Sequence, residues 1–296
     1  MSGSAAVIRA IRRAAARAVR RIRFGPLRYV VVVSYGRTGS TLLQGALMSA
    51  PHVLIRGEQG GTIVQQQIWF DELCRHQRRL ARQEETTRRH PFFGIVGFQQ
   101  QQALRRIRML LLESLLRPKW DTRVLGFKEN RWPDDPTKTL VFLRKLLPGV
   151  RFVVNTRNDD DVALSGFWPR RPDALQQIRR RRESLLAAAQ SLGDDVYFVH
   201  YDDWAGNPES LRGLFEWLQI PFSVERVAEV MQKPHSYRNR TIREIEILDE
   251  QRRLSPQARL AARRPVTMLA ATWTVVAAGQ VAALATAVAG VGPFAT

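Results

Sequence analysis

The chain has one cysteine, Cys74, among its 296 residues, so no intrachain disulfide can form. This composition fits a reducing compartment better than a secreted protein. Acidic residues are also scarce, because 27 Asp and Glu stand against 46 Lys and Arg, and none precedes Glu58. The basic amino-terminal residues lead into no uninterrupted apolar segment, which excludes a secretory signal peptide.

The net charge of +19 raises the question of a nucleic-acid partner. No zinc-ligand spacing, aromatic ribonucleoprotein motif or basic zipper is present, and the arginines are spread along the chain. We therefore predict no nucleic-acid partner. An anionic substrate, an anionic lipid surface or an arginine-rich genome would each explain the same charge.

The two ends of the chain have unusual compositions. Residues 1–28 contain eight arginines around a narrow apolar face, which predicts a basic amphipathic helix suited to anionic lipid. A transit peptide, a floppy basic extension or a misassigned start codon would look similar. Residues 265–296 lack charged side chains and exceed the roughly 20 residues that span a bilayer. We predict an apolar helical tail over 256–296 and a cytoplasmic enzyme attached to the inner membrane face; a tail packed on the domain or on a dimer partner is the alternative.

The most informative stretch is 29–58. Val30 to Val33 form a β-branched run typical of a parallel strand that is buried on both faces. A glycine-containing loop follows, and then apolar residues recur at helical spacing. A strand, a glycine loop and a helix start in this order gather backbone N–H groups and the positive end of a helix dipole. The stretch therefore predicts an anion site, with phosphate as the ligand.

The loop lacks the lysine of a nucleotide triphosphatase, because Ser40 follows Gly39 where the G-x-x-x-x-G-K-[ST] pattern requires lysine. Its basic group is Arg37, two residues before the second glycine. This arrangement suits a single phosphate better than a metal-chelated polyphosphate. Glycines used only for tight packing are the alternative reading of the loop.

A second signal lies in 150–168. Arg151 to Thr156 predict a strand, and Asn158 or Asp159 then caps a helix with an acidic first turn. Arg157 lies at the strand end, and Ser165 lies eight residues later, about two turns into the predicted helix. A guanidinium and a hydroxyl so placed can close on one phosphate. The pattern is weak alone and gains specificity from the upstream loop.

These motifs resemble those of sulfotransferases that use 3′-phosphoadenosine 5′-phosphosulfate (PAPS). The loop is similar to the R-[ST]-G-[ST]-T-L loop of the branch that includes tyrosylprotein and bacterial carbohydrate enzymes, and Arg157 with Ser165 resembles the 3′-phosphate site. The resemblance implies PAPS as co-substrate, 3′-phosphoadenosine 5′-phosphate (PAP) as product, and no metal. The nucleotide-binding residues it implies are Arg37, Thr38, Gly39, Ser40, Thr41, Arg157 and Ser165.

The same resemblance suggests the catalytic residues. Lys128 matches the lysine that contacts the phosphosulfate, and with Arg37 it would stabilise charge on the leaving phosphate. Cytosolic aryl sulfotransferases have a histidine base after this strand, and 125–135 contain none. Glu58 then becomes the predicted base, because a glutamate follows the second strand in the resembling branch. Glu129 is the competing candidate.

The predicted fold is α/β, a P-loop-like three-layer arrangement with a central, mostly parallel sheet of about five strands flanked by helices. We assign 29–255 to the sulfotransferase domain and 59–122 to an insertion holding the acceptor pocket and its lid. One amphipathic helix is predicted over Leu104 to Leu116. The acceptor is a hydroxyl of a carbohydrate, lipid or small molecule, and the oligomeric state is open. The alternatives are a P-loop nucleoside or sugar kinase that uses magnesium-ATP, and a membrane-associated scaffold with a degenerate sulfotransferase fold.

Overall fold

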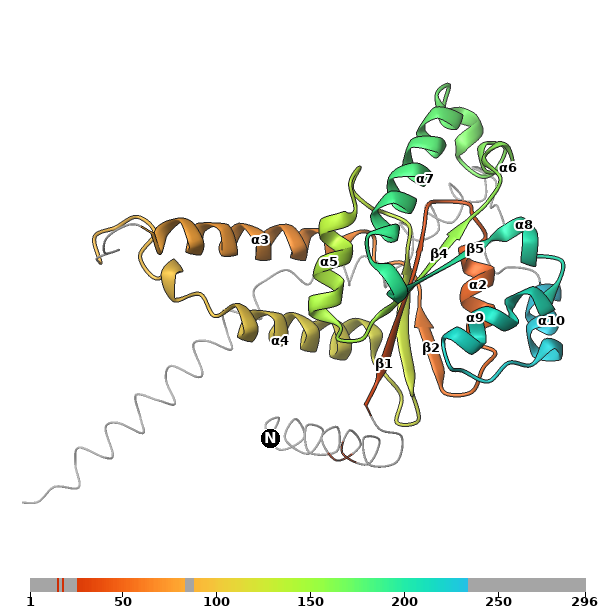
Figure 1. The fold of residues 1–296 in the computed structure, drawn as a ribbon, viewed down its shortest axis with the longest axis horizontal. Coiled ribbons are helices and arrows are strands. Elements are labelled where there is room, and N and C mark those ends of the chain that lie inside the picture. Colours follow the sequence, from red (N-terminus) through yellow and green to blue (C-terminus); the bar gives the residue numbers. More distant parts are fainter. Residues whose placement is uncertain (1–14, 16–17, 19–25, 83–87, 234–296) are drawn as a thin grey trace, which may run out of the picture. The chain divides into compact units, whose positions relative to one another are not determined.

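The computed structural model describes residues 15, 18, 26–82 and 88–233. Its centre is a five-stranded sheet in the order β2-β3-β1-β4-β5, in which every neighbouring pair is parallel (Figure 1). This confirms the predicted α/β fold with a parallel central sheet. The strands are β1 (Arg28–Ser34), β2 (Val53–Arg56), β3 (Val124–Glu129), β4 (Arg151–Thr156) and β5 (Val196–His200).

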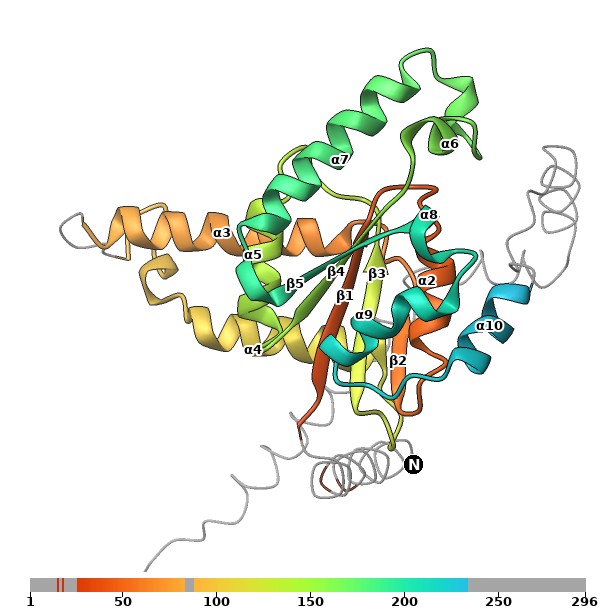
Figure 2. The ribbon, with the colours of Figure 1, turned by 45° about the vertical axis from the view of Figure 1, so that its right-hand side comes forward.

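Helices cover both faces of this sheet (Figure 2). The α-helices are α2 (Ser40–Leu47), α3 (Thr62–Leu80), α4 (Gln100–Leu110), α5 (Thr137–Leu146), α6 (Asp159–Ala163), α7 (Ala174–Gln190), α8 (Tyr201–Trp204), α9 (Arg212–Trp217) and α10 (Val224–Gln232). Shorter helical turns are η1 (Ile95–Gly97), the π-helix η2 (Leu111–Leu116), η3 (Trp168–Arg170), η4 (Gly193–Asp195) and η5 (Pro208–Leu211).

The valine run of β1 divides between the two cores. Val31 and Val33 pack with residues of α3, α4, α5 and α7, whereas Val30 and Val32 pack with residues of α2, α9 and α10. All four side chains are at most 3% exposed. Successive side chains of a strand point to opposite faces, so a continuous apolar run is what a sheet covered on both sides requires.

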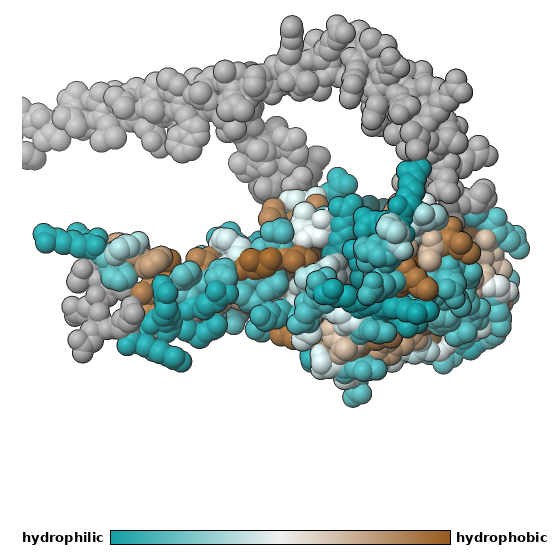
Figure 3. Space-filling model, turned by 90° about the horizontal axis from the view of Figure 1, so that it is seen from above, coloured by the Kyte–Doolittle hydropathy of each residue, from teal (hydrophilic) through white to brown (hydrophobic). Residues whose placement is uncertain are grey.

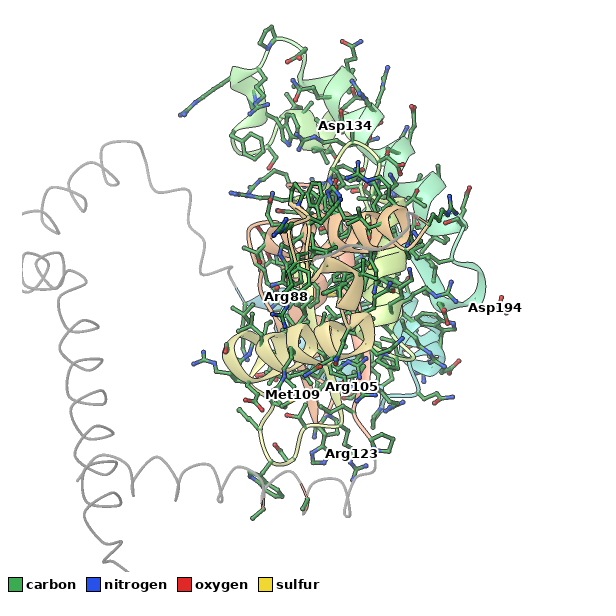
Figure 4. The ribbon with its side chains drawn as sticks, turned by 90° about the vertical axis from the view of Figure 1, so that its left-hand side faces the viewer. Arg88, Arg105, Met109, Arg123, Asp134 and Asp194 are labelled. Carbon is green, nitrogen blue, oxygen red and sulfur yellow. The ribbon has the colours of Figure 1, made fainter. Side chains whose placement is uncertain are left out.

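The insertion between β2 and β3 forms an arm, which we define as α3 and α4 (Figure 1). Figure 4 looks at the arm from its outer end and labels Arg105 and Met109 on α4. The helix predicted over Leu104 to Leu116 is present, but it starts at Gln100 and changes to the π-helix η2 after Leu110. Arg117, with a left-handed φ of 43°, ends it one residue before Pro118.

Three predictions about the chain ends fall wholly or mostly outside the described residues. They concern the basic helix of 1–28, the end of the domain over 234–255 and the apolar tail of 256–296. Of the first, Ala15 and Ala18 are helical, whereas residues 26–28 are not helical and Arg28 begins β1. Within 26–82 and 88–233, none of the helices combines the length and apolar character needed to cross a bilayer.

Candidate active site

The loop after β1 depends on a glycine at position 39. Gly39 has a φ of 79°, a left-handed conformation that costs other residues about 1–2 kcal/mol. A Cβ at this position would also lie 2.1 Å from the ring of Tyr201, which packs directly on the glycine. Arg37 shares the left-handed region, with a φ of 78°. The conformation of the loop is therefore restricted by these two residues and by the ring of Tyr201 in α8.

The side chain of Asn155, near the end of β4, holds the loop after β1 in place. Its Nδ2 donates to the carbonyl of Thr38 at 2.7 Å and to the Thr38 hydroxyl at 3.2 Å, and Trp204 donates to its Oδ1 at 3.4 Å. Asn155 and Thr38 are both fully buried. The side chain and the carbonyl of Thr38 thus support the loop from a position closed to solvent.

The amino end of α2 follows directly and is suited to an anion. No side chain caps this helix, and its first turn contains no acidic residue. Ser40 is buried and Thr41 is exposed at the helix start. Free N–H groups and the helix dipole together favour negative charge at this point.

Two charged side chains meet where β2 and β3 end beside each other. Glu58 follows β2, Lys128 is in β3, and the Lys128 ammonium donates to Glu58 Oε1. The lysine side chain is 7% exposed, whereas the glutamate side chain is 36% exposed. Glu58 is therefore held by a buried cation and still reachable from solvent, as a general base must be.

The rival base, Glu129, has a different environment. Its carboxylate is fully buried and accepts hydrogen bonds from four backbone N–H groups. Oε2 receives those of Gln59 and Gly61 at 3.1 and 3.0 Å, and Oε1 receives those of Asn130 and Arg131 at 2.9 and 3.0 Å. This carboxylate anchors the turn that follows Glu58, and the geometry favours Glu58 for contact with a substrate.

Arg37 and Ser165 are brought into contact, although they lie 128 residues apart. The Arg37 Nε donates to the Ser165 hydroxyl at 3.0 Å. Gly166, with a φ of 64°, allows this approach, because a Cβ there would lie 2.7 Å from the same Nε. Ser165 lies beyond the end of α6 at Ala163, so placing it two turns inside a helix was wrong. The left-handed glycine ends the helix early.

Arg157 lies at the carboxyl end of β4, close to the same loop. Its guanidinium stacks over the Tyr201 ring at 4.7 Å and lies 3.7 Å from Asp161 and 3.8 Å from Asp202. Its Nε is buried and has no hydrogen-bond partner in the protein. The two carboxylates lie beyond hydrogen-bond distance, so the guanidinium can still donate hydrogen bonds to an anion.

Tyr35 connects the loop after β1 to Arg157. Its hydroxyl donates to the Arg157 carbonyl at 3.2 Å and accepts from the Arg157 N–H at 3.4 Å. Burial raises the pKa of Tyr35 to about 12. Asn158, one of the two predicted caps, caps α6 and accepts from the N–H groups of Asp160 and Asp161. The loop after β1 and the arginine after β4 are thus tied together by one side chain.

A family model described as "Sulfotransferase family" matches residues 29–224. The chain belongs to the sulfotransferase family. The match spans β1 to the start of α10 and includes every predicted site residue of this sulfotransferase. No curated protein matches the chain.

Two of the solved structures to which the chain is similar are the following. The sulfotransferase domain of the Synechococcus PCC 7002 olefin synthase is 14% identical; the alignment covers 75% of this chain and 83% of that domain, with a TM-score of 0.46. A sulfotransferase from Alicyclobacillus acidocaldarius is 13% identical over 75% of this chain and 90% of its own, with a TM-score of 0.38.

A cleft opens beside Glu58 in this sulfotransferase. Its volume is about 480 Å³, within the range of about 300–1,000 Å³ that small-molecule sites occupy. It is lined by the segment after β2, the start of α3, and the end of α4 with η2: Arg56, Gly57, Glu58, Gln59, Thr62, Gln66, Leu110, Ser114, Leu115 and Leu116. Among the described residues, no group of three His, Cys, Asp or Glu side chains could hold a metal ion.

Three residues have roles in the site that the sequence did not predict. Asn155 could have been noticed as a lone amide ending a valine-rich strand. Tyr201 follows β5 directly, and its ring contacts both Gly39 and Arg157. Glu129 was considered only as a base, and sequence alone gives no sign of its four backbone bonds. His200 makes local contacts, 2.9 Å from the Thr156 hydroxyl and 3.2 Å from Asp202.

Proposed function

We propose that this sulfotransferase transfers the sulfuryl group of PAPS to an acceptor hydroxyl, with Glu58 as the general base. One observation carries the proposal: Glu58 and Lys128 form an ion pair at the edge of the sheet where the uncapped amino end of α2 also lies. In open α/β sheets, ligands bind at the carboxyl ends of the strands.

The residues present fit an adenosine bisphosphate. The N–H groups at the start of α2 and the adjoining Arg37 suit the 5′-phosphate, since the first turn contains no competing acid. The buried Nε of Arg157 has no hydrogen-bond partner in the protein, with the Asp202 carboxylate 3.8 Å away, which suits the 3′-phosphate. Ser165 lies against Arg37 and is only partly exposed, so it would close the space between the two phosphates.

The chemistry of the proposed step follows from these positions. The acceptor oxygen forms a bond to sulfur while the bond from sulfur to the bridging oxygen of the 5′-phosphate breaks. Glu58 takes the proton of the acceptor hydroxyl, and the electron pair of the broken bond stays on the phosphate of PAP. Lys128 and Arg37 stabilise that developing charge, an effect strongest in a site already organised before reaction.

Isothermal calorimetry tests the donor assignment. We expect PAP to bind without magnesium and more tightly than ATP with magnesium. The missing lysine at Ser40 removes the contact that a triphosphate requires. Tighter binding of magnesium-ATP would support the kinase alternative instead. Binding of PAP without release of PAP from PAPS in the presence of any hydroxyl acceptor would favour the scaffold alternative.

A further inference from the structure

One wall of the cleft beside Glu58 holds two unpaired amide atoms. Gln59 Nε2 and Gln66 Oε1 are both buried, and neither has a hydrogen-bond partner in the protein. A buried polar atom left unsatisfied costs about 1–3 kcal/mol, so such atoms ordinarily meet a partner. A ligand that both accepts and donates hydrogen bonds would satisfy this wall.

The opposite wall is apolar and open. Leu110 is 54% exposed and Leu115 is 43% exposed, and together with Leu116 they line the cleft from the end of α4 and from η2. π-Helical turns occur frequently at functional sites, and this one places adjacent leucines at the cleft. Exposed leucines gathered at a cleft favour a ligand with an apolar part.

The apolar character continues onto the arm. Trp69, 52% exposed, lies three residues after Gln66 on α3, and the helical repeat puts both on one face. Ile68 beside it is 46% exposed. Figure 3 shows hydrophobic residues among hydrophilic ones along the arm. A ligand longer than the cleft would therefore meet further apolar surface.

Both charged side chains that line the cleft already have hydrogen-bond partners. The Arg56 guanidinium donates to the carbonyls of Leu116 and Arg117 at 2.8 and 3.3 Å. Glu58, the other charged lining residue, is paired with Lys128. An ionic acceptor would have to compete with these contacts for its partner, so a neutral molecule fits the cleft better.

We infer that the cleft binds a neutral amphiphilic alcohol, taken up as a single molecule, and presents its hydroxyl to Glu58. The inference rests on the proposed function, because it names the acceptor class of the same site. Gln59 and Gln66 bind a second polar group close to the reacting hydroxyl. Leu110 and Leu115 bind the apolar skeleton. Highly charged acceptors and fully polar sugars match these walls less well.

Two neutral probes separate the apolar contribution from the polar one. Octyl β-D-glucoside and methyl β-D-glucoside carry the same hydroxyls and differ only in the alkyl chain. We expect the octyl compound, as monomer, to bind at least about tenfold more tightly, since each methylene group in an apolar pocket can be worth that factor. Titrations are run with and without PAP, so failure of PAP binding, which would refute the proposed donor, is recorded separately.

Substitutions test which residues cause the difference in affinity between the two probes. The double variant Leu110→Ser and Leu115→Ser should bring the affinity ratio of the two probes close to one. Val141→Ser, a change at a 37% exposed residue of α5, should leave the ratio unchanged. Gln66→Leu should weaken both probes about equally and preserve their ratio. Equal binding of the two probes by the wild type, or an unchanged ratio in the double variant, would overturn the inference.

Discussion

Replacing Glu129 by glutamine should destabilise the protein strongly, although the change conserves size and shape. The buried carboxylate accepts four backbone N–H groups, two at each oxygen. In glutamine one oxygen becomes an NH₂ group, which faces two donors that it cannot accept. Each lost bond to a charged group is worth about 1.5–3 kcal/mol, so the loss is about 3–6 kcal/mol. Typical domains have a free energy of unfolding of about 5–15 kcal/mol, so this is a large fraction.

Thermal unfolding measures this effect directly. For a protein of this size, 1 kcal/mol lowers Tm by about 2–4 °C, so Glu129→Gln should lower Tm by about 6–24 °C. Glu183→Gln is the matched control, because Glu183 is exposed on α7. Hydrogen exchange at the amides of Gln59 and Gly61 should also accelerate. A Tm within about 3 °C of the wild type would refute the anchoring role of Glu129.

The remaining predictions concern the base, the loop glycine and the buried phenol. Glu58→Gln should lower turnover by about 10²–10⁴-fold, the usual worth of a general base, and leave the Kd for PAP within about twofold, measured by calorimetry; near-normal turnover would reject the assignment. Gly39→Ala should lower Tm far more than Gly149→Ala: both glycines have positive φ, but only the former would place a Cβ against Tyr201, whereas the latter faces open space. The pKa of Tyr35 is raised in the folded protein to about 12 from an unfolded value near 10, so its contribution to stability is complete below pH 10 and is lost as pH rises through 12. About 2 kcal/mol of stability should be lost between pH 9 and pH 11.5 in the wild type and retained in Tyr35→Phe, as measured by denaturant titration at the two pH values.

The sheet and the main anion site could be predicted from the sequence because their signals are local. A valine run, a glycine loop and apolar residues at helical spacing are all contained in 29–50. The strand Arg151–Thr156 was placed at its observed bounds, and the Asn158 cap was one of two candidates. Parallel strands then bring their carboxyl ends to one edge, so Glu58 and Lys128 were expected near the loop.

The supporting contacts could not be predicted, because they depend on which side chains meet across the fold. Asn155 reaches Thr38 over 117 residues, and Tyr201 packs on Gly39 from another strand end. The contact of Arg37 with Ser165 depends on the early end of α6 at Ala163, which a helical pattern does not reveal. The cleft beside Glu58 depends in the same way on the switch from α4 to a π-helix.

The central claim is that Arg157 and the loop after β1 hold the two phosphates of one nucleotide. The most direct test compares the affinities of PAP and AMP, which differ only in the 3′-phosphate, for the wild type and for Arg157→Ala. One charge-assisted contact is worth about 1.5–3 kcal/mol, so PAP should bind the wild type about 10–100-fold more tightly than AMP. The variant should lose that preference and keep its affinity for AMP. Equal affinities in the wild type, or an undiminished preference in the variant, would contradict the account.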